Sequence, residues 1–249
     1  MSREISTDTL RTWLDERRPV MVLDIRNEAD RSQWAIPGSL HVDAYDELRE
    51  GRPGLLATTD LPADRPIVTV CNAGRVSRTA ADLLEARGLD AWSLGGGMKS
   101  WSLAWNAADV AAAETAARVI QLRRTGKGCL SYVVGAQGEA MVVDPSLPAS
   151  VYLEVIRRNG WTLRFVLETH VHADHLSRAR QLADESRAVL VLPAQNRVRF
   201  AFTAVNDGDV IALGRSTLTA LRTPGHTDES TTYVLDDAIA FTEAPALPT

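Results

Sequence analysis

Residues 66–77 have the sequence PIVTVCNAGRVS, and this stretch decides the fold of the first half of the chain. The apolar run over 66–70 is typical of a buried parallel strand, and Cys71 follows it directly. A helical pattern of apolar residues continues from Ser77, and Gly88 supplies its end. The order strand, loop, helix therefore predicts an α/β fold with a parallel sheet flanked by helices, in which Cys71 lies at the carboxyl end of a strand.

The composition of the 249 residues restricts the class of protein. Hydrophobic residues make up 45% and charged residues 24% of the chain, which is typical of one or two folded domains and excludes disorder. The 27 basic and 32 acidic residues give a net charge of -5, so no nucleic-acid partner is expected. No uncharged apolar run approaches the roughly 18 residues of a membrane span, and the first twenty residues are too acidic for a signal peptide. We therefore expect a soluble cytoplasmic protein without a membrane partner.

Alanine-rich residues 105–117 hold few side chains that could anchor a core, so they predict a linker, which could be helical. This linker separates a first domain over 1–104 from a second domain over 118–249. The second domain opens with a predicted hairpin over 131–144. It continues with helices over 151–158 and 176–185 and strands over 163–167, 189–192 and 217–221. The pattern predicts a second layered α/β domain.

The loop over 71–77 combines a thiol with an anion-binding arrangement. Because a helix begins at the end of this loop, its backbone N–H groups and the helix dipole can point at one anion. These donors and the guanidinium of Arg75 would stabilise a thiolate or persulfide at Cys71, which favours nucleophilic sulfur transfer. The alternative is a buried cysteine that packs as a small hydrophobic residue.

Further segments around this loop carry a resemblance to a known family. They are VLDIR at 22–26, IPGS at 36–39 and LGGGMKSW at 94–101. With them, the first hundred residues resemble a rhodanese domain. The resemblance implies that Cys71 is the catalytic nucleophile, which carries sulfur as a persulfide without a cofactor. It also implies that the loop binds substrate anions through Asn72, Ala73, Gly74, Arg75, Val76 and Ser77. Many single-domain members carry an arginine at the place of Val76, and here Arg75 and Arg78 stand on either side of it.

Four of the five histidines lie in two short motifs, HVHADH at 170–175 and TPGHT at 223–227. His170 and His172 follow a predicted strand, and Asp174 and His175 lie about one turn further along. Imidazoles and a carboxylate that converge at the end of a strand predict a metal site. The alternative is a set of unrelated surface histidines.

These motifs resemble those of the metallo-β-lactamase superfamily, and most of all those of its persulfide dioxygenases. The resemblance implies an αββα fold and a single non-haem iron, Fe2+, held by His170, His226 and an aspartate. It makes His172, Asp174 and His175 substrate-orienting groups or alternative metal ligands. Hydrolytic relatives such as glyoxalase II hold two metal ions, usually zinc, with Asp174 and His175 among the ligands.

One departure from this pattern concerns the expected aspartate. In the family, a Gly-Asp pair follows the Phe-Thr of a later strand, whereas here Glu243 and Ala244 follow Phe241 and Thr242. Only 132 residues run from Arg118 to Thr249 (249 − 118 + 1), so we expect an incomplete domain with an impaired metal site. The alternatives are a site completed by a partner subunit or by Glu243.

Together, these features predict a rhodanese-type sulfurtransferase that moves sulfur from thiosulfate or glutathione persulfide to a thiol. They predict its fusion to an impaired iron-dependent domain that resembles persulfide dioxygenases, which oxidise glutathione persulfide to sulfite. One alternative is a dinuclear zinc hydrolase that cleaves thioesters. Another is a non-catalytic sulfur carrier or sensor, in which exposed strand edges would favour oligomerisation.

Overall fold

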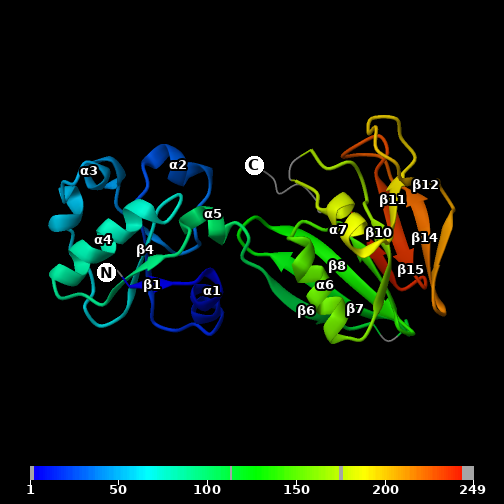
Figure 1. Cartoon of the computed structure of the whole chain (residues 1–249), viewed down its shortest axis with the longest axis horizontal. Helices are drawn as coiled ribbons and strands as arrows, with labels where there is room; N and C mark the ends of the chain where they lie inside the picture. Colours follow the sequence, from blue (N-terminus) through cyan, green and yellow to red (C-terminus); the bar gives the residue numbers. More distant parts are fainter. Residues whose placement is uncertain (1–2, 113, 174–175, 243–249) are drawn as a thin grey trace. The chain divides into compact units, whose positions relative to one another are not determined.

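The computed structural model describes residues 3–112, 114–173 and 176–242 (Figure 1). The chain divides into two compact units, Met1–Ala104 and Trp105–Thr249. Among the described helices, none combines the length and the apolar character that crossing a bilayer requires.

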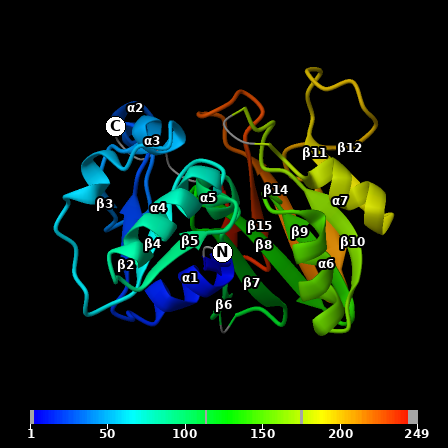
Figure 2. The ribbon, with the colours of Figure 1, turned by 60° about the vertical axis from the view of Figure 1, so that its left-hand side comes forward.

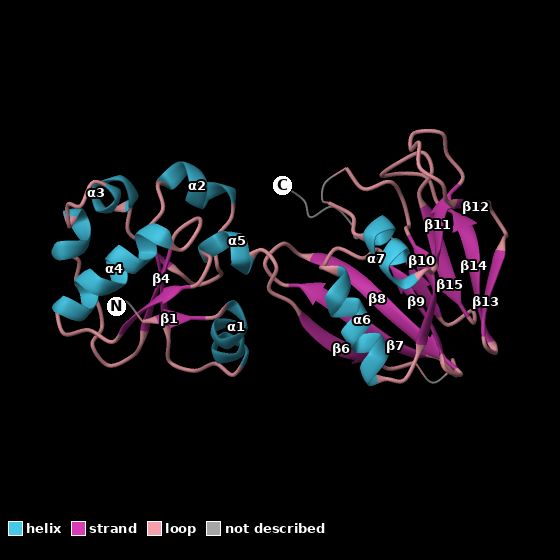
Figure 3. Ribbon diagram, viewed as in Figure 1, coloured by secondary structure: helices cyan, strands magenta, loops and turns pink. Residues whose placement is uncertain are grey.

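The first unit is built on a five-stranded sheet in the order β1-β5-β4-β2-β3. Figure 3 colours its strands magenta and its helices cyan. Every pair of neighbouring strands is parallel, as the sequence predicts. The strands are β1 (Glu4–Ile5), β2 (Met21–Asp24), β3 (Leu40–His41), β4 (Ile67–Val70) and β5 (Ala91–Leu94). The helices are α1 (Thr7–Asp15), α2 (Glu28–Gln33), α3 (Tyr45–Arg49), α4 (Arg75–Ala86) and α5 (Gly97–Trp101), with a 3-10 helix over Gly54–Ala57.

Helices cover both faces of this sheet, and every residue of its central strand β4 is buried. On β2, Leu23 enters one hydrophobic cluster and Val22 enters the other, since successive side chains of a strand point to opposite faces. The first cluster is closed by α3 and α4, and the second by α1 and α5. The expected parallel sheet flanked by helices is therefore confirmed.

The second unit contains two sheets. A seven-stranded mixed sheet has the order β12-β11-β10-β9-β8-β7-β6, and a four-stranded antiparallel sheet has the order β13-β14-β15-β16. The strands of the larger sheet are β6 (Asn106–Val110), β7 (Arg118–Arg124), β8 (Cys129–Ala136), β9 (Glu139–Val143), β10 (Thr162–Leu167), β11 (Val189–Pro193) and β12 (Thr203–Val205). Those of the smaller sheet are β13 (Val210–Leu213), β14 (Ser216–Arg222), β15 (Thr231–Leu235) and β16 (Ile239–Phe241), and the helices are α6 (Ala149–Arg158) and α7 (Ala179–Ser186).

The described part of this unit has three layers (Figure 2). Val143 and Leu167 of the larger sheet pack against Leu218 and Tyr233 of the smaller sheet in one apolar cluster. The opposite face of the larger sheet is covered by α6 and α7, which contribute Tyr152, Leu182 and their neighbours to a second cluster. The strands β9 and β10 are parallel and end together, with Val143 beside Leu167.

The structure of residues 105–117 differs from the predicted linker. Asn106–Val110 forms β6, an edge strand of the larger sheet, and not a helix. It pairs antiparallel with β7, from Asn106 opposite Arg123 to Val110 opposite Val119. Its central residues, 107–109, are exposed. The strand is therefore held by backbone hydrogen bonds to β7 and not by the apolar anchors whose scarcity suggested a linker.

Candidate active sites in the two units

Cys71 follows β4 and faces the first turn of α4. This helix begins at Arg75, two residues before the predicted start, because Gly74 adopts a φ of 82° and ends the loop early. The Ser77 N–H donates to Cys71 Sγ at 3.4 Å, and the thiol in turn donates to Ser77 Oγ at 3.4 Å. The sulfur atom is thus held at the positive end of the helix dipole, where a negative charge on it is stabilised.

The glycine-rich segment at 95–97 and the two residues after it pack against the thiol loop. The Met98 N–H donates to the Cys71 carbonyl at 2.8 Å, and the Lys99 N–H donates to that of Asn72 at 3.0 Å. A Cβ atom on Gly97 would lie 2.1 Å from the Cys71 carbonyl oxygen, so only glycine allows this approach. Gly97 therefore allows α5 to pack closely against the thiol loop.

The remaining loop residues have different surroundings. Asn72 Nδ2 donates to the Asp30 carboxylate on α2 at 2.6 Å. Val76 is buried in the cluster under α4, so any contact of this residue with an anion is limited to its backbone. Arg78 pairs with Glu4 at 2.8 Å, whereas Arg75 is exposed and forms no ion pair with the described residues. Arg75 is therefore the guanidinium of this loop that is available to an anionic substrate.

In the second unit, the two histidine motifs come together although His226 lies 56 positions after His170 in the chain. His170 follows β10 and is 5% exposed, and His226 lies on the loop between β14 and β15. The ring centroid of His170 lies 4.0 Å from that of His172 and 4.9 Å from that of His226. The predicted alternative ligands Asp174 and His175, as well as Glu243 and Ala244, lie outside the described residues.

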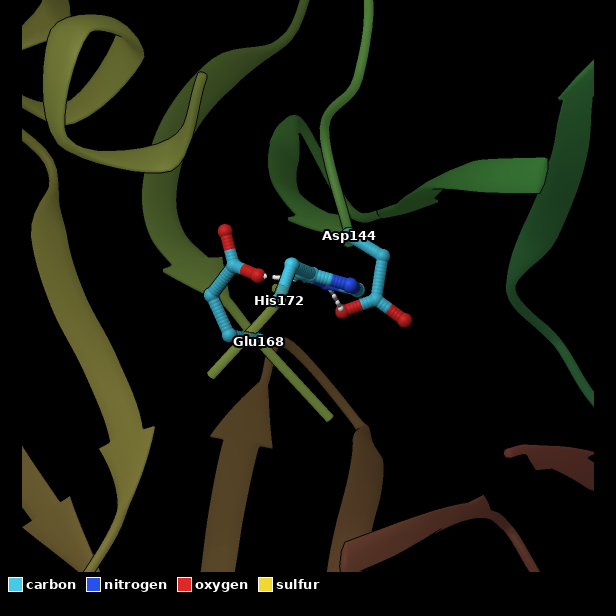
Figure 4. A group of neighbouring side chains, drawn as sticks. All are labelled: Asp144, Glu168 and His172. Carbon is cyan, nitrogen blue, oxygen red and sulfur yellow. Dashed lines mark hydrogen bonds and ion pairs between the residues drawn. The ribbon is translucent and has the colours of Figure 1, made fainter. Parts of the chain in front are cut away.

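Two buried carboxylates that the prediction of site residues missed lie beside His172 (Figure 4). His172 Nε2 lies 2.7 Å from Glu168 Oε2 and 3.2 Å from Asp144 Oδ1. Asp144 also accepts hydrogen bonds from the backbone and the hydroxyl of Thr169, at 2.7 and 2.8 Å. The sequence held a signal for these residues, since each acid directly follows an apolar strand and the parallel strands β9 and β10 end at the same edge.

Burial and charge set the ionisation of this group. Burial raises the pKa of Glu168 to about 7. Burial opposes the charged form of His172, but its hydrogen bonds to Asp144 and Glu168 raise the pKa of the imidazole to about 10. The two carboxylates within 3.2 Å of His172 therefore favour positive charge at this place, carried either by the imidazole or by a bound cation.

These residues fit a divalent metal ion by the chemistry of their donors. Imidazole nitrogens and carboxylate oxygens are the ligands of protein-bound Zn(II) and non-haem Fe(II). One ligand atom from each of Asp144, Glu168 and His172 lies within 4.8 Å of the other two. The ring of His170 lies beside that of His172, and the ring of His226 lies beside that of His170. The structure thus adds the carboxylates of Asp144 and Glu168 to the predicted ligands His170 and His226 and the predicted alternative ligand His172.

Comparisons with known families agree with this division of the chain. Residues 6–104 match the family model of the rhodanese-like domain, and residues 124–238 match that of the metallo-beta-lactamase superfamily. The chain joins a rhodanese-like domain to a metallo-beta-lactamase domain. Both predicted resemblances are thereby confirmed, and the superfamily of the second domain implies metal binding.

Curated relatives match part of the chain. A hydroxyacylglutathione hydrolase from Rhodopseudomonas palustris (strain BisB18) is 36% identical over 101 residues, which are 40% of this chain and 40% of that protein. One from Prochlorococcus marinus (strain MIT 9211) is 32% identical over 124 residues, 49% of each chain. The chain therefore spans half or less of the length of these relatives.

Among solved structures, ETHE1 from Myxococcus xanthus is 33% identical, with a TM-score of 0.44 over 47% of this chain and 53% of that one. A rhodanese-related protein from Thermoplasma volcanium is 24% identical, with a TM-score of 0.33 over 40% of this chain and 89% of that one.

Proposed function

We propose that the rhodanese-like domain is a sulfurtransferase that carries sulfane sulfur on Cys71. The observation that supports this function best is the position of Sγ at the N-terminal end of α4, 3.4 Å from the Ser77 amide. A backbone donor and a helix dipole stabilise a thiolate, which is the reactive form of cysteine. Arg75, exposed and without an ion pair among the described residues, would attract the anionic sulfur donor.

The reaction consists of two displacements at sulfur. In the first, the Cys71 thiolate attacks the outer sulfur of thiosulfate, the sulfur–sulfur bond breaks, and sulfite leaves with the electron pair. Cys71 then holds a persulfide, whose negative outer sulfur replaces the thiolate near the loop amides. In the second, an acceptor thiolate attacks that outer sulfur and the Cys71 thiolate leaves, which restores the starting state.

The alternative, a packed core thiol, rests on the burial of Cys71, which is 1% exposed and packs in the cluster under α4. Transfer from thiosulfate to a thiol or cyanide, with persulfide formation followed by mass spectrometry, separates the two. We expect a mass gain of one sulfur atom on Cys71 and loss of turnover in Cys71→Ser. Cys129→Ser is the matched control and should retain both. Equal rates in wild type and Cys71→Ser would contradict the proposal.

For the metallo-beta-lactamase domain, we propose a metal-dependent reaction on a glutathione-linked sulfur compound. His170 and His226 would hold the ion, and the carboxylates Asp144 and Glu168 would fix His172 beside it. A bound Fe(II) supplies redox chemistry toward dioxygen, whereas Zn(II) supplies Lewis acidity toward a thioester carbonyl.

Two substrates are consistent with this domain. The adjoining rhodanese-like domain favours glutathione persulfide, which dioxygen and water convert into glutathione and sulfite, because both domains would then handle sulfane sulfur. The names of the curated relatives favour an acylglutathione thioester instead. Metal analysis after anaerobic purification, followed by oxygen uptake with glutathione persulfide and thioester cleavage with an acylglutathione, decides between them.

Because Ala244 stands where the family has an aspartate, we expect weak iron loading and slow oxygen uptake with glutathione persulfide. Zinc with thioester cleavage would establish the hydrolase instead. A protein that takes up neither metal and shows neither activity would leave sulfur transfer as the reaction of the chain, or a sulfur-carrier role if Cys71 forms a persulfide without turnover.

A further inference from the structure

Glu229 is a buried carboxylate on the loop that carries His226, and it reaches the loop that carries the other histidines. Its side chain is 8% exposed, and Oε1 accepts a hydrogen bond from the backbone N–H of Val171 at 3.1 Å. Val171 is the residue between His170 and His172. A single carboxylate thus connects the two segments on which the histidine cluster depends.

A backbone contact reinforces this connection. The Thr231 N–H donates to the Thr169 carbonyl at 2.9 Å, directly before His170. Within the His226 loop, Thr227 N–H donates to Ser230 Oγ at 3.1 Å and Thr223 N–H donates to the Ser230 carbonyl at 2.8 Å. Hydrogen bonds within the His226 loop therefore fix its conformation, and Glu229 connects the loop to the segment over 168–172.

Arg197 also binds the carboxylate of Glu229. The guanidinium forms an ion pair with the same oxygen that accepts from Val171, and about half of the arginine side chain is exposed. Burial alone would favour the neutral acid, but the amide of Val171 and the charge of Arg197 hold the pKa of Glu229 below its ordinary value. The acceptor is consequently charged at neutral pH.

We propose that Glu229 is a positioning residue of the metal centre, which holds the His226 loop against the amide between His170 and His172. This inference rests on the metal-binding part of the proposed function. Ligands on two separate loops must be aligned before they bind one ion, and a connection that exists without the metal removes part of that ordering cost. Groups that orient metal ligands typically change metal affinity by about 10- to 100-fold when they are removed.

Titration of the full-length, metal-free protein with Co(II), followed by its visible absorption, tests this role. We expect Glu229→Ala to weaken Co(II) binding by about 10- to 100-fold. Glu229→Gln keeps a carbonyl oxygen for the Val171 amide and should recover most of the affinity, which a general loss of packing would not allow. Asp228→Asn, at the exposed neighbouring position, is the matched control and should bind like wild type.

Hydrogen exchange in the metal-free variants provides a second measurement. Loss of the connection should accelerate exchange at Val171 and its neighbours in Glu229→Ala, with little change in the first domain. If Glu229→Ala does not fold, Arg197→Met takes its place and should weaken Co(II) binding to a smaller extent.

The outcomes separate this inference from the function on which it rests. Equal Co(II) affinities of wild type and Glu229→Ala, with unchanged exchange at Val171, would overturn the role of Glu229 alone. Failure of the wild-type protein to bind Co(II) would overturn the metal centre itself.

Discussion

Gly97 lies directly against Cys71, and a Cβ atom at position 97 would be 2.1 Å from the Cys71 carbonyl oxygen. The backbone of Gly97 also has a φ of 58°, which residues other than glycine rarely adopt. The thiol loop and α5 are therefore packed backbone to backbone, and the position of the sulfur depends on this contact.

Gly97→Ala should displace the thiol loop. We expect a loss of about 1–3 kcal/mol in the free energy of unfolding, together with at least a tenfold loss in sulfur transfer, because the methyl group must push the backbone of the thiol loop away from α5 and thereby displace the sulfur atom. Gly88→Ala is the control, since Gly88 has a φ of 82° but a Cβ atom added there would meet no other atom within 4 Å. It should lose stability through backbone strain and retain the transfer rate per folded molecule. Equal transfer rates for both variants would contradict a link between this packing and catalysis.

Asp30 on α2 should position the loop through Asn72. Its carboxylate accepts from Asn72 Nδ2 at 2.6 Å, and Asn27 caps the helix at Asp30 N–H. We expect Asp30→Ala to lower kcat for sulfur transfer by about 10- to 100-fold, with KM for thiosulfate changed much less, because Asp30 orients the loop rather than binding the donor. Steady-state kinetics beside the exposed control Asp60→Ala measure this effect. A change confined to KM would instead place Asp30 in donor binding.

Arg26 and Asp24 form a buried ion pair that should make the first domain sensitive to acid. Both side chains are 1% exposed, and the guanidinium lies 2.7 Å from the carboxylate. Burial would raise the pKa of Asp24, but hydrogen bonds from Arg26 and Arg31 hold it below the ordinary value of 3.8. Since the unfolded chain binds this proton more tightly, the pair contributes stability above the unfolded pKa. The contribution is lost as the pH falls through the folded pKa.

Arg26→Met tests this pair. At pH 7 we expect a loss of about 3–5 kcal/mol in the free energy of unfolding, because a buried carboxylate loses its main partner. Below about pH 4 the difference from wild type should shrink, since Asp24 becomes neutral in the variant and in the unfolded chain. Urea unfolding across this pH range measures both, and Arg65→Met, in an exposed pair with Asp64, should change stability by less than about 0.5 kcal/mol. A difference that grows toward acid pH would contradict the assigned ionisation.

Parts of these sites could be predicted because their determinants are local in sequence. The thiol loop lies between a strand that ends just before Cys71 and a helix that begins four residues later. These two neighbouring elements largely determine the position of the loop. The motif at 170–172 likewise begins three residues after the last residue of β10, so its position at the end of a strand is set by its neighbours. The approach of His226 could be expected only from the resemblance, since nothing near residue 226 indicates which strand it will face.

The contacts that sequence reasoning missed depend on pairings between distant segments. Asp144 meets His172 because β9 and β10 are parallel and end in register. Glu229 meets Val171 only after the two sheets have packed, and the sequence around Glu229 is otherwise that of an exposed polar turn. Strand β6 escapes prediction for the same reason, because its alanines carry no apolar pattern and its partner β7 supplies the hydrogen bonds that define it.

Tyr152 links the core of the second domain to the segment that carries Asp144. Its buried hydroxyl accepts from the amides of Ser146 and Leu147 at 2.9 and 3.1 Å and bonds to Ser131 Oγ at 2.8 Å. Tyr152→Phe leaves two buried amides without an acceptor, so we expect a loss of about 2–4 kcal/mol in the free energy of unfolding. Because these amides follow Asp144 and Pro145 in the chain, Co(II) binding should weaken as well.

Tyr132→Phe removes a half-buried hydroxyl with one bond to Gln121 and should lose less than about 1 kcal/mol without any effect on Co(II). Urea unfolding and Co(II) titration on the same samples measure both effects. A loss of stability with unchanged Co(II) affinity would show that the segment after Asp144 does not position the Asp144 carboxylate.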